Sequence, residues 1–412
     1  MPSSTSSFET TAAVAAATAA IALDVPAAAP ERFERPGFER PGFVRLTASD
    51  RPGVAQPVPV RDIPPQPWNR IFFVAMLLAA LLVAGWELYW RAYGVAPSYR
   101  NSDGQWAQQR RRIDEGEGGK TVLIGSSRVL FDVQLPVWEK ATGERPIQLA
   151  LEGSSPVPFL EDLAADPNFT GRLLVGVTPG LFFSGRALRG DAIAYYHKQG
   201  PSQRSGHWLS QHLLEPWLAF YDPDFALATV VKRLAWPVRP GMHEPPAVRK
   251  LALQDSDRNT HMWRKLETDP GYRAMVRGGW AARFAKPPPD MDTPAKAQTI
   301  IDAQIKRAAV AVKKLRSRGV KVLFVRAPSN GPYYAAEQRD LPRAQTWDRL
   351  LQATGAPGIH FEDYPQLQGY EQPEWSHLSA AEANRFTAAL VPLVEREFSR
   401  MENQVAPAAA QP

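Results

Sequence analysis

The chain lacks cysteine, and this absence excludes several kinds of site. With no thiol among its 412 residues, the protein can form no disulfide framework, no thiolate metal site and no cysteine nucleophile. Histidine is scarce as well, with seven copies, and His207 and His212 are five positions apart, which does not place them on one face of a helix. We therefore predict no metal site and no cofactor.

Concentrated positive charge is also missing. Lys and Arg outnumber Asp and Glu by 48 to 42, which gives a net charge of +6, but the arginines are scattered along the chain rather than gathered into a stripe. A nucleic-acid-binding surface normally shows such a stripe, so we predict no nucleic-acid partner. The 44% hydrophobic content is ample for one large domain with its own core and some unfolded sequence beside it.

Long apolar runs are few, and one of them has the character of a membrane helix. The run from Ile71 to Trp86 carries no charge, and Trp68, Tyr89 and Trp90 flank it. Aromatic residues at both ends of an apolar helix are typical of the headgroup level of a bilayer. We predict a transmembrane helix over residues 68–91; a buried core helix is the alternative.

The side of the membrane on which the body lies is not decided by charge. Arg51, Arg61 and Arg70 precede the predicted span, and Arg91 and Arg100 follow it, so the positive-inside rule favours neither orientation. On functional grounds we expect a single-pass protein of the inner membrane with its large C-terminal body in the periplasm. A body that faces the cytoplasm is the alternative, and the lack of cysteine is compatible with both compartments.

The two ends of the chain have the composition of unfolded sequence. Residues 1–67 are rich in Ala, Pro, Ser and Thr and contain the tandem repeat Phe33–Gly37 and Phe38–Gly42, so they cannot bury enough apolar surface to fold. The repeat is either a partner-binding peptide or a product of repeat slippage. We expect a loose tail over residues 401–412 and a linker with a juxtamembrane helix over residues 92–118.

Between these parts, apolar strands alternate with helical patterns. The predicted strands are 120–125, 146–151, 172–177, 320–325 and 358–361, and the predicted helices are 135–142, 157–165, 293–319, 335–354 and one that Ser379 and Glu382 cap. This alternation predicts an α/β domain over residues 119–400, built on a doubly wound, mostly parallel sheet. In such folds the site lies beyond the carboxyl ends of the strands.

A long insertion, residues 179–292, interrupts the alternation. It has a mainly helical pattern and is rich in tryptophan, including Trp208, Trp217, Trp236, Trp263 and Trp280. We interpret it as a cap over the site. Its aromatic side chains either stack on sugar rings or form the core of the cap itself.

Two short motifs carry the chemistry. Gly125, Ser126, Ser127 and Arg128 follow the first apolar strand, and Glu374-x-x-His377 precedes the last helix. A serine at the carboxyl end of a strand can present its hydroxyl above the sheet, where a histidine brought there by the fold can take its proton. The alternative for Ser127 is a tight turn that needs small residues. Glu362 or Asp363 could orient His377 in place of Glu374.

The order and spacing of these motifs resemble the SGNH (GDSL-like) hydrolase and acyltransferase superfamily over roughly residues 120–398. The resemblance implies a flavodoxin-like fold with Ser127 as nucleophile, His377 as general base and Glu374 as the group that orients it. It also implies that the amide of Gly153 helps to bind the oxyanion. The chain departs from the family at Ser126 and Glu374, where the family has aspartate.

A third departure concerns the oxyanion site. The family's Gly-x-Asn-Asp block is Gly176, Val177, Thr178 and Pro179 in this chain, so the asparagine that donates to the oxyanion is missing. Loss of one such donor typically costs about 10²- to 10³-fold in rate. Thr178 or Asn330 are the candidates to replace it.

The GSSR variant with an N-terminal membrane helix resembles envelope members of this superfamily. The resemblance implies a serine esterase or O-acyltransferase that acts on acyl or acetyl groups of an exported polysaccharide, with a membrane-bound acyl donor protein as a possible partner. Arg128 and Arg326 are candidates to bind an anionic substrate group, and a buried salt bridge is the alternative for Arg128. A non-catalytic scaffold or polysaccharide-binding subunit of the same fold is the alternative function.

Overall fold

A five-stranded parallel sheet is the centre of the domain. The computed structural model describes residues 65–234, 250–284 and 289–405, and the strand order of the sheet is β2-β1-β3-β6-β7. This confirms the predicted parallel α/β sheet. The strand bounds are β1 Thr121–Ile124, β2 Ile147–Gln148, β3 Arg172–Gly176, β6 Lys321–Arg326 and β7 Gly358–His360.

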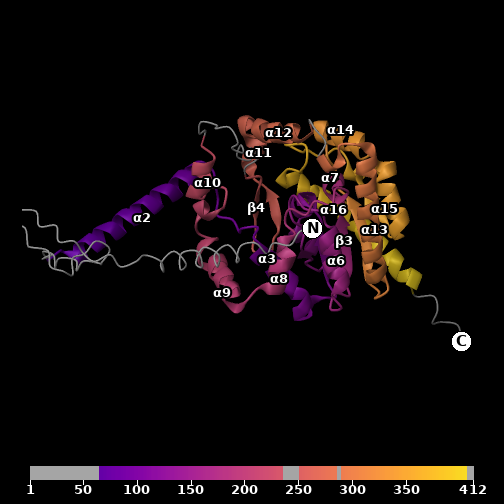
Figure 1. Ribbon diagram of the computed structural model, residues 1–412, viewed down its shortest axis with the longest axis horizontal. Helices are drawn as coiled ribbons and strands as arrows, with labels where there is room; N and C mark the ends of the chain where they lie inside the picture. The colour runs from indigo at the N-terminus through magenta and orange to yellow at the C-terminus, as the bar shows by residue number, and fades with distance from the viewer. Residues whose placement is uncertain (1–64, 235–249, 285–288, 406–412) are drawn as a thin grey trace, which may run out of the picture. The chain divides into compact units, whose positions relative to one another are not determined.

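Helices cover both faces of this sheet, which is why its strands are buried at nearly every position. Leu123, Leu174 and Leu323 lie side by side and belong to the core of one face, whereas Val122 and Val322 belong to the core of the other. Figure 1 shows α13 beside α15. On one face lie α3 Asp103–Arg112, α6 Val157–Ala165, α13 Pro294–Arg316 and α15 Trp347–Thr354; on the other lie α4 Ser127–Asp132, α5 Leu135–Thr142 and α16 Ala380–Val405.

Helix α3 lies in the region predicted to be a linker with a juxtamembrane helix, and its side chains belong to the core of the domain. Ser102 caps the helix by accepting from the amide of Gln105, and Trp106 packs against Phe159 with ring centroids 5.4 Å apart. The buried guanidinium of Arg110 pairs with two carboxylates of the α6 segment. The domain therefore begins before residue 119.

Two predicted helix boundaries are wrong. The predicted helix 335–354 is two helices, α14 Gly331–Asp340 and α15, because Pro342 between them has no amide hydrogen and cannot continue a helix. At the C-terminus α16 extends to Val405, so residues 401–405 are helical rather than part of a tail. Glu402 anchors this last turn through ion pairs with Arg172 and Lys321. The rest of the two predicted tails, residues 1–64 and 406–412, lies outside the described residues.

The insertion is mainly helical, as predicted, but it also contains an antiparallel hairpin of β4 Ala252–Gln254 and β5 Thr260–Met262. Its helices are α7 Pro179–Phe182, α8 Asp191–Lys198, α9 Pro201–Leu209, α10 Leu227–Lys232, α11 Arg264–Thr268 and α12 Pro270–Phe284. Within the insertion, short helical turns occupy Ser210–Leu214, Ala219–Tyr221 and Pro289–Met291. Elsewhere in the chain they occupy Ile113–Glu117, Arg343–Gln345, Phe361–Asp363 and Pro365–Leu367. Trp263 and Trp280 belong to a separate apolar core of this insertion, whereas Trp208 and Trp217 are exposed; Trp236 lies outside the described residues.

Helix α2, Trp68–Ala92, is long and apolar enough to cross a membrane. Its most apolar window of 18 residues has a mean hydropathy of 2.3, and none of that window is buried. A core helix of this domain would be buried instead. Among the described residues, the contacts of α2 with the domain lie in its last turns: Trp90 packs on Phe225 with ring centroids 4.7 Å apart, and Glu87 accepts from the amides of Ala219 and Phe220.

Candidate active site

Ser127 stands at the point where β1 turns into α4. Strand β1 ends at Ile124, and Ser126 occupies the N-cap position of the helix whose first residue is Ser127, without a capping hydrogen bond from its side chain. Every residue from Thr121 to Leu135 is buried except Ser127, which is half-buried. Within this segment Ser127 is therefore the one side chain with access to solvent.

Two glycines allow this tight turn. A Cβ atom on Gly125 would lie 2.7 Å from Cγ2 of Val129, and one on Gly176 would lie 2.0 Å from the same methyl group. Both distances are too short for real carbon atoms. With glycine at both positions, Val129 packs directly onto the ends of β1 and β3, and this packing sets the start of α4 and the position of Ser127.

His377 reaches Ser127 from the other end of the chain. Its Nε2 lies 2.7 Å from Oγ of Ser127, across 250 positions of sequence, and its Nδ1 lies 2.7 Å from Oε1 of Glu374. The same Oε1 accepts the backbone amide of His377 at 2.6 Å. This tight Glu374 to His377 turn requires Trp375 to adopt a φ of 74°, a left-handed conformation that non-glycine residues keep only where the surroundings enforce it.

Glu374 is buried and fully hydrogen-bonded. Its second oxygen accepts from the indole N–H of Trp280 on α12. Burial alone would raise the pKa of Glu374, but the neighbouring His377 and the hydrogen bonds from His377 and Trp280 lower this pKa below its ordinary value. The carboxylate is therefore ionised at neutral pH, so it can hold the Nδ1–H tautomer and stabilise a protonated imidazole.

Trp280 is a functional contact that the sequence did not reveal. Nothing in the local sequence separates it from the other tryptophans of the insertion. Its indole N–H donates to the carboxylate of Glu374, and its ring centroid is 6.4 Å from that of His377. On the other side the imidazole packs against Phe131 at 4.6 Å.

Replacing Trp280 by phenylalanine is expected to lower kcat/KM toward an activated ester by roughly tenfold to a hundredfold. The ring remains, but one buried carboxylate oxygen loses its donor, which costs about 1–3 kcal/mol. The matched control is Trp263→Phe, since Trp263 is a buried tryptophan of the same cluster whose N–H donates to the carbonyl of Gly94. Equal losses in both variants would show that Trp280 contributes packing only.

Asp132, at the end of α4, is a second buried carboxyl group that was not predicted. Its Oδ1 accepts from the amide of Leu378 at 3.0 Å, directly after His377, and its Oδ2 has no hydrogen-bond partner. Burial raises the pKa of Asp132 to about 7, although His377, the Leu378 amide and Arg128 oppose the shift. Asp132 thus ties the histidine turn to the serine helix.

The raised pKa of Asp132 predicts a pH-dependent stability. Between its ordinary pKa of 3.8 and about 7 the folded protein holds a proton that the unfolded chain has released, so this group makes stability fall as pH rises through that window. The side-chain amide of the Asp132→Asn variant cannot titrate. Urea denaturation of full-length protein in detergent should therefore show the variant gaining stability relative to wild type from pH 5 to pH 8. A stability difference that is independent of pH would contradict the assignment.

Ser127 and His377 open into a cavity of about 620 Å³ between the carboxyl edge of the sheet and the insertion. The α/β core contributes Leu130, Phe131, Gly153 and Thr178 to its wall, and the insertion contributes Leu188, Arg189, Asp222, Lys250, Trp280 and Arg283. The lining mixes charged and aromatic side chains, so the cavity suits a polar substrate with apolar faces.

The three oxyanion candidates are placed differently. Gly153, with a φ of 68°, and Thr178 both line the cavity together with Ser127. The hydroxyl of Thr178 lies 2.5 Å from that of Ser126. Asn330 is not among the lining residues: its amide donates to the carbonyl of Trp375, and its side-chain oxygen is buried without a partner. The structure therefore brings Gly153 and Thr178 to the serine, but not Asn330.

The two arginine candidates lie beneath the site rather than in it. Arg128 and Arg326 are buried, and they share the carboxylate of Glu337 at 2.9 Å and 2.6 Å. Neither lines the cavity, so the structure does not place them where they were predicted to bind substrate. They form a buried salt bridge with Glu337 that joins α4, β6 and α14. The alternative partners of His377 are also engaged elsewhere, Glu362 by Tyr334 and Asp363 by Arg343.

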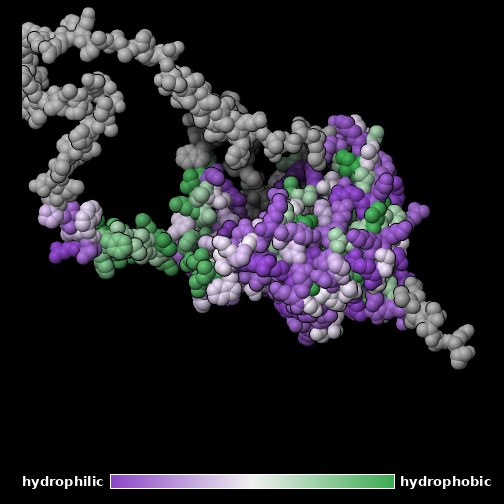
Figure 2. All heavy atoms as spheres, turned by 60° about the horizontal axis from the view of Figure 1, so that its bottom comes forward, coloured by the Kyte–Doolittle hydropathy of each residue, from purple (hydrophilic) through white to green (hydrophobic). Residues whose placement is uncertain are grey.

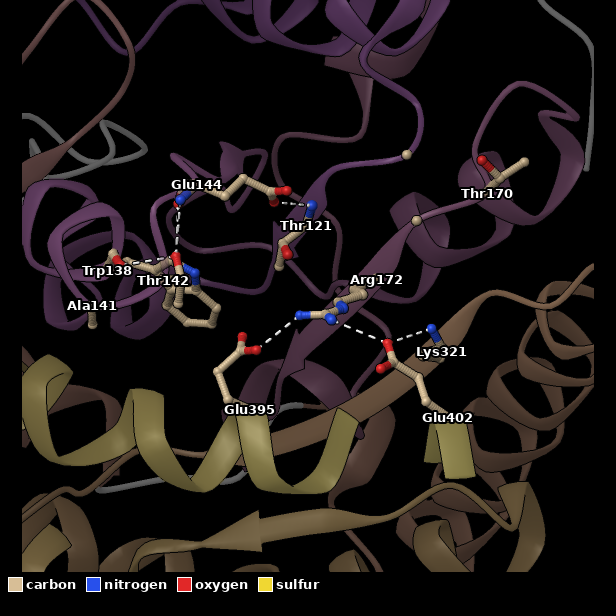
Figure 3. Close-up of a pocket in the computed structure, with 12 residues that line it drawn as sticks. Thr121, Trp138, Ala141, Thr142, Glu144, Thr170, Arg172, Lys321, Glu395 and Glu402 are labelled. Atoms are coloured by element: carbon tan, nitrogen blue, oxygen red, sulfur yellow. Dashed lines mark hydrogen bonds and ion pairs between the residues drawn. The ribbon is translucent and has the colours of Figure 1, made fainter. Parts of the chain in front are cut away.

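A second pocket, of about 650 Å³, lies at the opposite edge of the sheet. Figure 3 shows Arg172 between Glu395 and Glu402, with Lys321 reaching Glu402. Arg172 and Lys321 are the first residues of β3 and β6, so this pocket is far along the strands from Ser127. Its charges neutralise one another and hold α16 against the sheet, which is a structural role.

Over residues 65–234, 250–284 and 289–405, no group of three His, Asp or Glu side chains is placed to hold a metal ion. In comparisons with known proteins, no family model matches this chain, and no curated protein is significantly similar to it. The geometry of the site therefore carries the functional inference.

Proposed function

We propose that the protein is a membrane-anchored serine esterase or O-acyltransferase with Ser127 as its nucleophile. The observation that supports this most strongly is the continuous chain of hydrogen bonds from Ser127 through His377 to Glu374, with 2.7 Å at each step. A buried carboxylate, an imidazole and a half-exposed serine in this order are the groups that acyl transfer requires.

The reaction follows from these positions. The Ser127 hydroxyl attacks the carbonyl carbon of an acyl ester while Nε2 of His377 takes its proton. The tetrahedral intermediate collapses, the alcohol leaves with that proton, and the acyl group stays on Ser127 as an ester. Water or a sugar hydroxyl then attacks the acyl-enzyme, again with His377 as base, which releases the acid or transfers the acyl group.

The oxyanion of the intermediate needs donors at the same place. The amides of Ser127 and Gly153 are the proposed donors. Ser127 is in the first turn of α4, where amides have no partner within the helix, and Gly153 lines the same cavity as Ser127. Thr178 lies in the same cavity, but its hydroxyl is engaged with Ser126.

Strand order and chain order support membership of the SGNH superfamily. The order β2-β1-β3-β6-β7 is that of doubly wound, flavodoxin-like sheets, with the serine after the first strand and the histidine before the last helix. The departures from the family at Ser126 and Thr178 are neighbours that hydrogen-bond each other at 2.5 Å. We interpret them as a paired replacement that keeps the ends of β1 and β3 linked.

Location and substrate belong to the same proposal. Helix α2 would anchor the chain in the inner membrane with the domain in the periplasm, where an exported polysaccharide would supply or accept the acyl group. A membrane-bound acyl donor protein is the matching partner for transfer. The charged and aromatic side chains of the cavity wall are compatible with a sugar polymer.

The test is covalent labelling with a fluorophosphonate, followed by mass spectrometry of the labelled peptide. We expect the label on Ser127 and hydrolysis of an activated acetyl ester; added sugar oligomers then separate transfer from hydrolysis by the appearance of acetylated sugar. The absence of a label on Ser127 would favour a non-catalytic scaffold. The departures at the oxyanion block favour that second function, whereas the short distance from Ser127 to His377 opposes it.

A further inference from the structure

Exposed apolar side chains are concentrated in one segment of the insertion. Outside α2, most of the large apolar residues that are exposed among the described residues lie between positions 208 and 234. Trp217, Leu213 and Leu227 are each at least 60% exposed. We call this set the apolar patch: Trp208, Leu209, Leu213, Trp217, Leu227 and Leu234.

The segment that carries the apolar patch is attached to the end of α2. Arg91, near the end of α2, donates to the carbonyl of Trp217 at 2.7 Å. Glu87, one turn earlier, accepts from the amides of Ala219 and Phe220 at 3.0 Å and 3.1 Å. Figure 1 shows α9 and α10 on the side of the domain from which α2 projects, and Figure 2 shows apolar side chains gathered where α2 meets the domain.

This arrangement favours the lipid surface as the occupant of the patch. A soluble surface rarely leaves so many large apolar side chains uncovered, and such patches mark contact sites. The segment is tied to the end of α2, so a bilayer crossed by α2 would reach it. Exposed Arg204 and Lys232 flank the patch, and apolar side chains with basic neighbours are typical of segments that lie in the lipid headgroup region.

We propose that residues 208–234 form a membrane-docking element that inserts the apolar patch into the lipid surface beside α2. This inference rests on the membrane anchoring proposed above. The same segment supplies Asp222, Pro223 and Asp224 to the wall of the cavity. Docking therefore holds that wall at the membrane surface, and the cavity receives substrates that are presented there.

The chain has no native cysteine, so single cysteines can report lipid contact in the full-length protein. Leu213→Cys and Leu227→Cys probe the patch. Leu78→Cys, in α2, reports the anchor, and Val310→Cys is the matched control, because Val310 is an apolar residue on α13 that is 64% exposed. Each variant carries an environment-sensitive fluorophore and is reconstituted at one copy per nanodisc of phosphatidylethanolamine and phosphatidylglycerol with quencher-bearing lipid.

We expect labels at Leu213 and Leu227 to be quenched several-fold more than the label at Val310, with Leu78 quenched as well. If Leu78 is quenched but Leu213 and Leu227 behave like Val310, the docking proposal is wrong and the anchor stands. If Leu78 is not quenched, the anchor and the docking fail together. Shielding that appears only with two copies per disc would assign the patch to a second copy and overturn the proposal. Fluorophosphonate labelling of each variant tests the proposed chemistry separately.

Discussion

Replacing Ser127 by alanine is expected to abolish fluorophosphonate labelling and to lower hydrolysis of an activated acetyl ester by about 10³-fold or more. The hydroxyl is positioned to form the acyl-enzyme, since it lies 2.7 Å from the imidazole that would take its proton. Alanine removes that bond-forming atom and little volume. The measurement is kcat/KM of the full-length protein in detergent, together with intact mass after labelling.

The matched control for this substitution is Ser317→Ala. Ser317 is an exposed serine just after α13, away from the cavity, so its variant should label and hydrolyse as wild type does. If Ser127→Ala retains wild-type activity, another nucleophile is responsible and the proposed function is wrong. Thermal unfolding of both variants shows that a lost activity is not a lost fold.

Glu374→Gln is the second substitution with a large expected effect, a loss in kcat of roughly 10³- to 10⁴-fold. The carboxylate accepts three hydrogen bonds: Oε1 takes the amide and Nδ1–H of His377, and Oε2 takes the indole N–H of Trp280. A glutamine has one acceptor oxygen, so its NH₂ group must face one of these donors. It also removes the negative charge that stabilises a protonated His377 during the reaction.

The comparison that isolates the charge is Glu374→Asp. Aspartate keeps the charge and the acceptor oxygens, although its carboxylate lies one methylene further back. We expect Glu374→Asp to retain clearly more activity than Glu374→Gln, while both still label slowly at Ser127. The reverse order would show that the length of the side chain, rather than its charge, controls the site.

The site was predictable in part, and the reason is topological. Ser127 and His377 follow different elements of a parallel α/β pattern, and the carboxyl ends of parallel strands meet at one edge. That rule brings together residues 250 positions apart without any knowledge of side-chain positions. No such rule predicts the positions of Trp280 and Asp132. Trp280 donates to Glu374 and Asp132 accepts from Leu378, and these contacts exist only once the insertion and the C-terminal segment are packed.

Two errors have similar causes. Arg128 and Arg326 carry a charge beside the predicted site, but only packing decides whether such a charge meets solvent or the buried carboxylate of Glu337. The sequence predicts a linker with a juxtamembrane helix over residues 92–118, whereas α3 packs into the core. Its burial depends on Trp106 and Arg110, which meet partners on α6.

By itself, the sequence determined the features that depend on local pattern: the parallel α/β architecture, the apolar helix α2, the small-residue turn at Ser127 and the Glu374 to His377 motif. The period of apolar residues, caps and glycines encodes these features within a few turns of the chain. Only the tertiary structure decided that Trp280 donates a hydrogen bond to the carboxylate of Glu374, that Arg128 is buried, and that the apolar patch lies beside α2. Those facts depend on distances between segments far apart in sequence, which local periodicity does not encode.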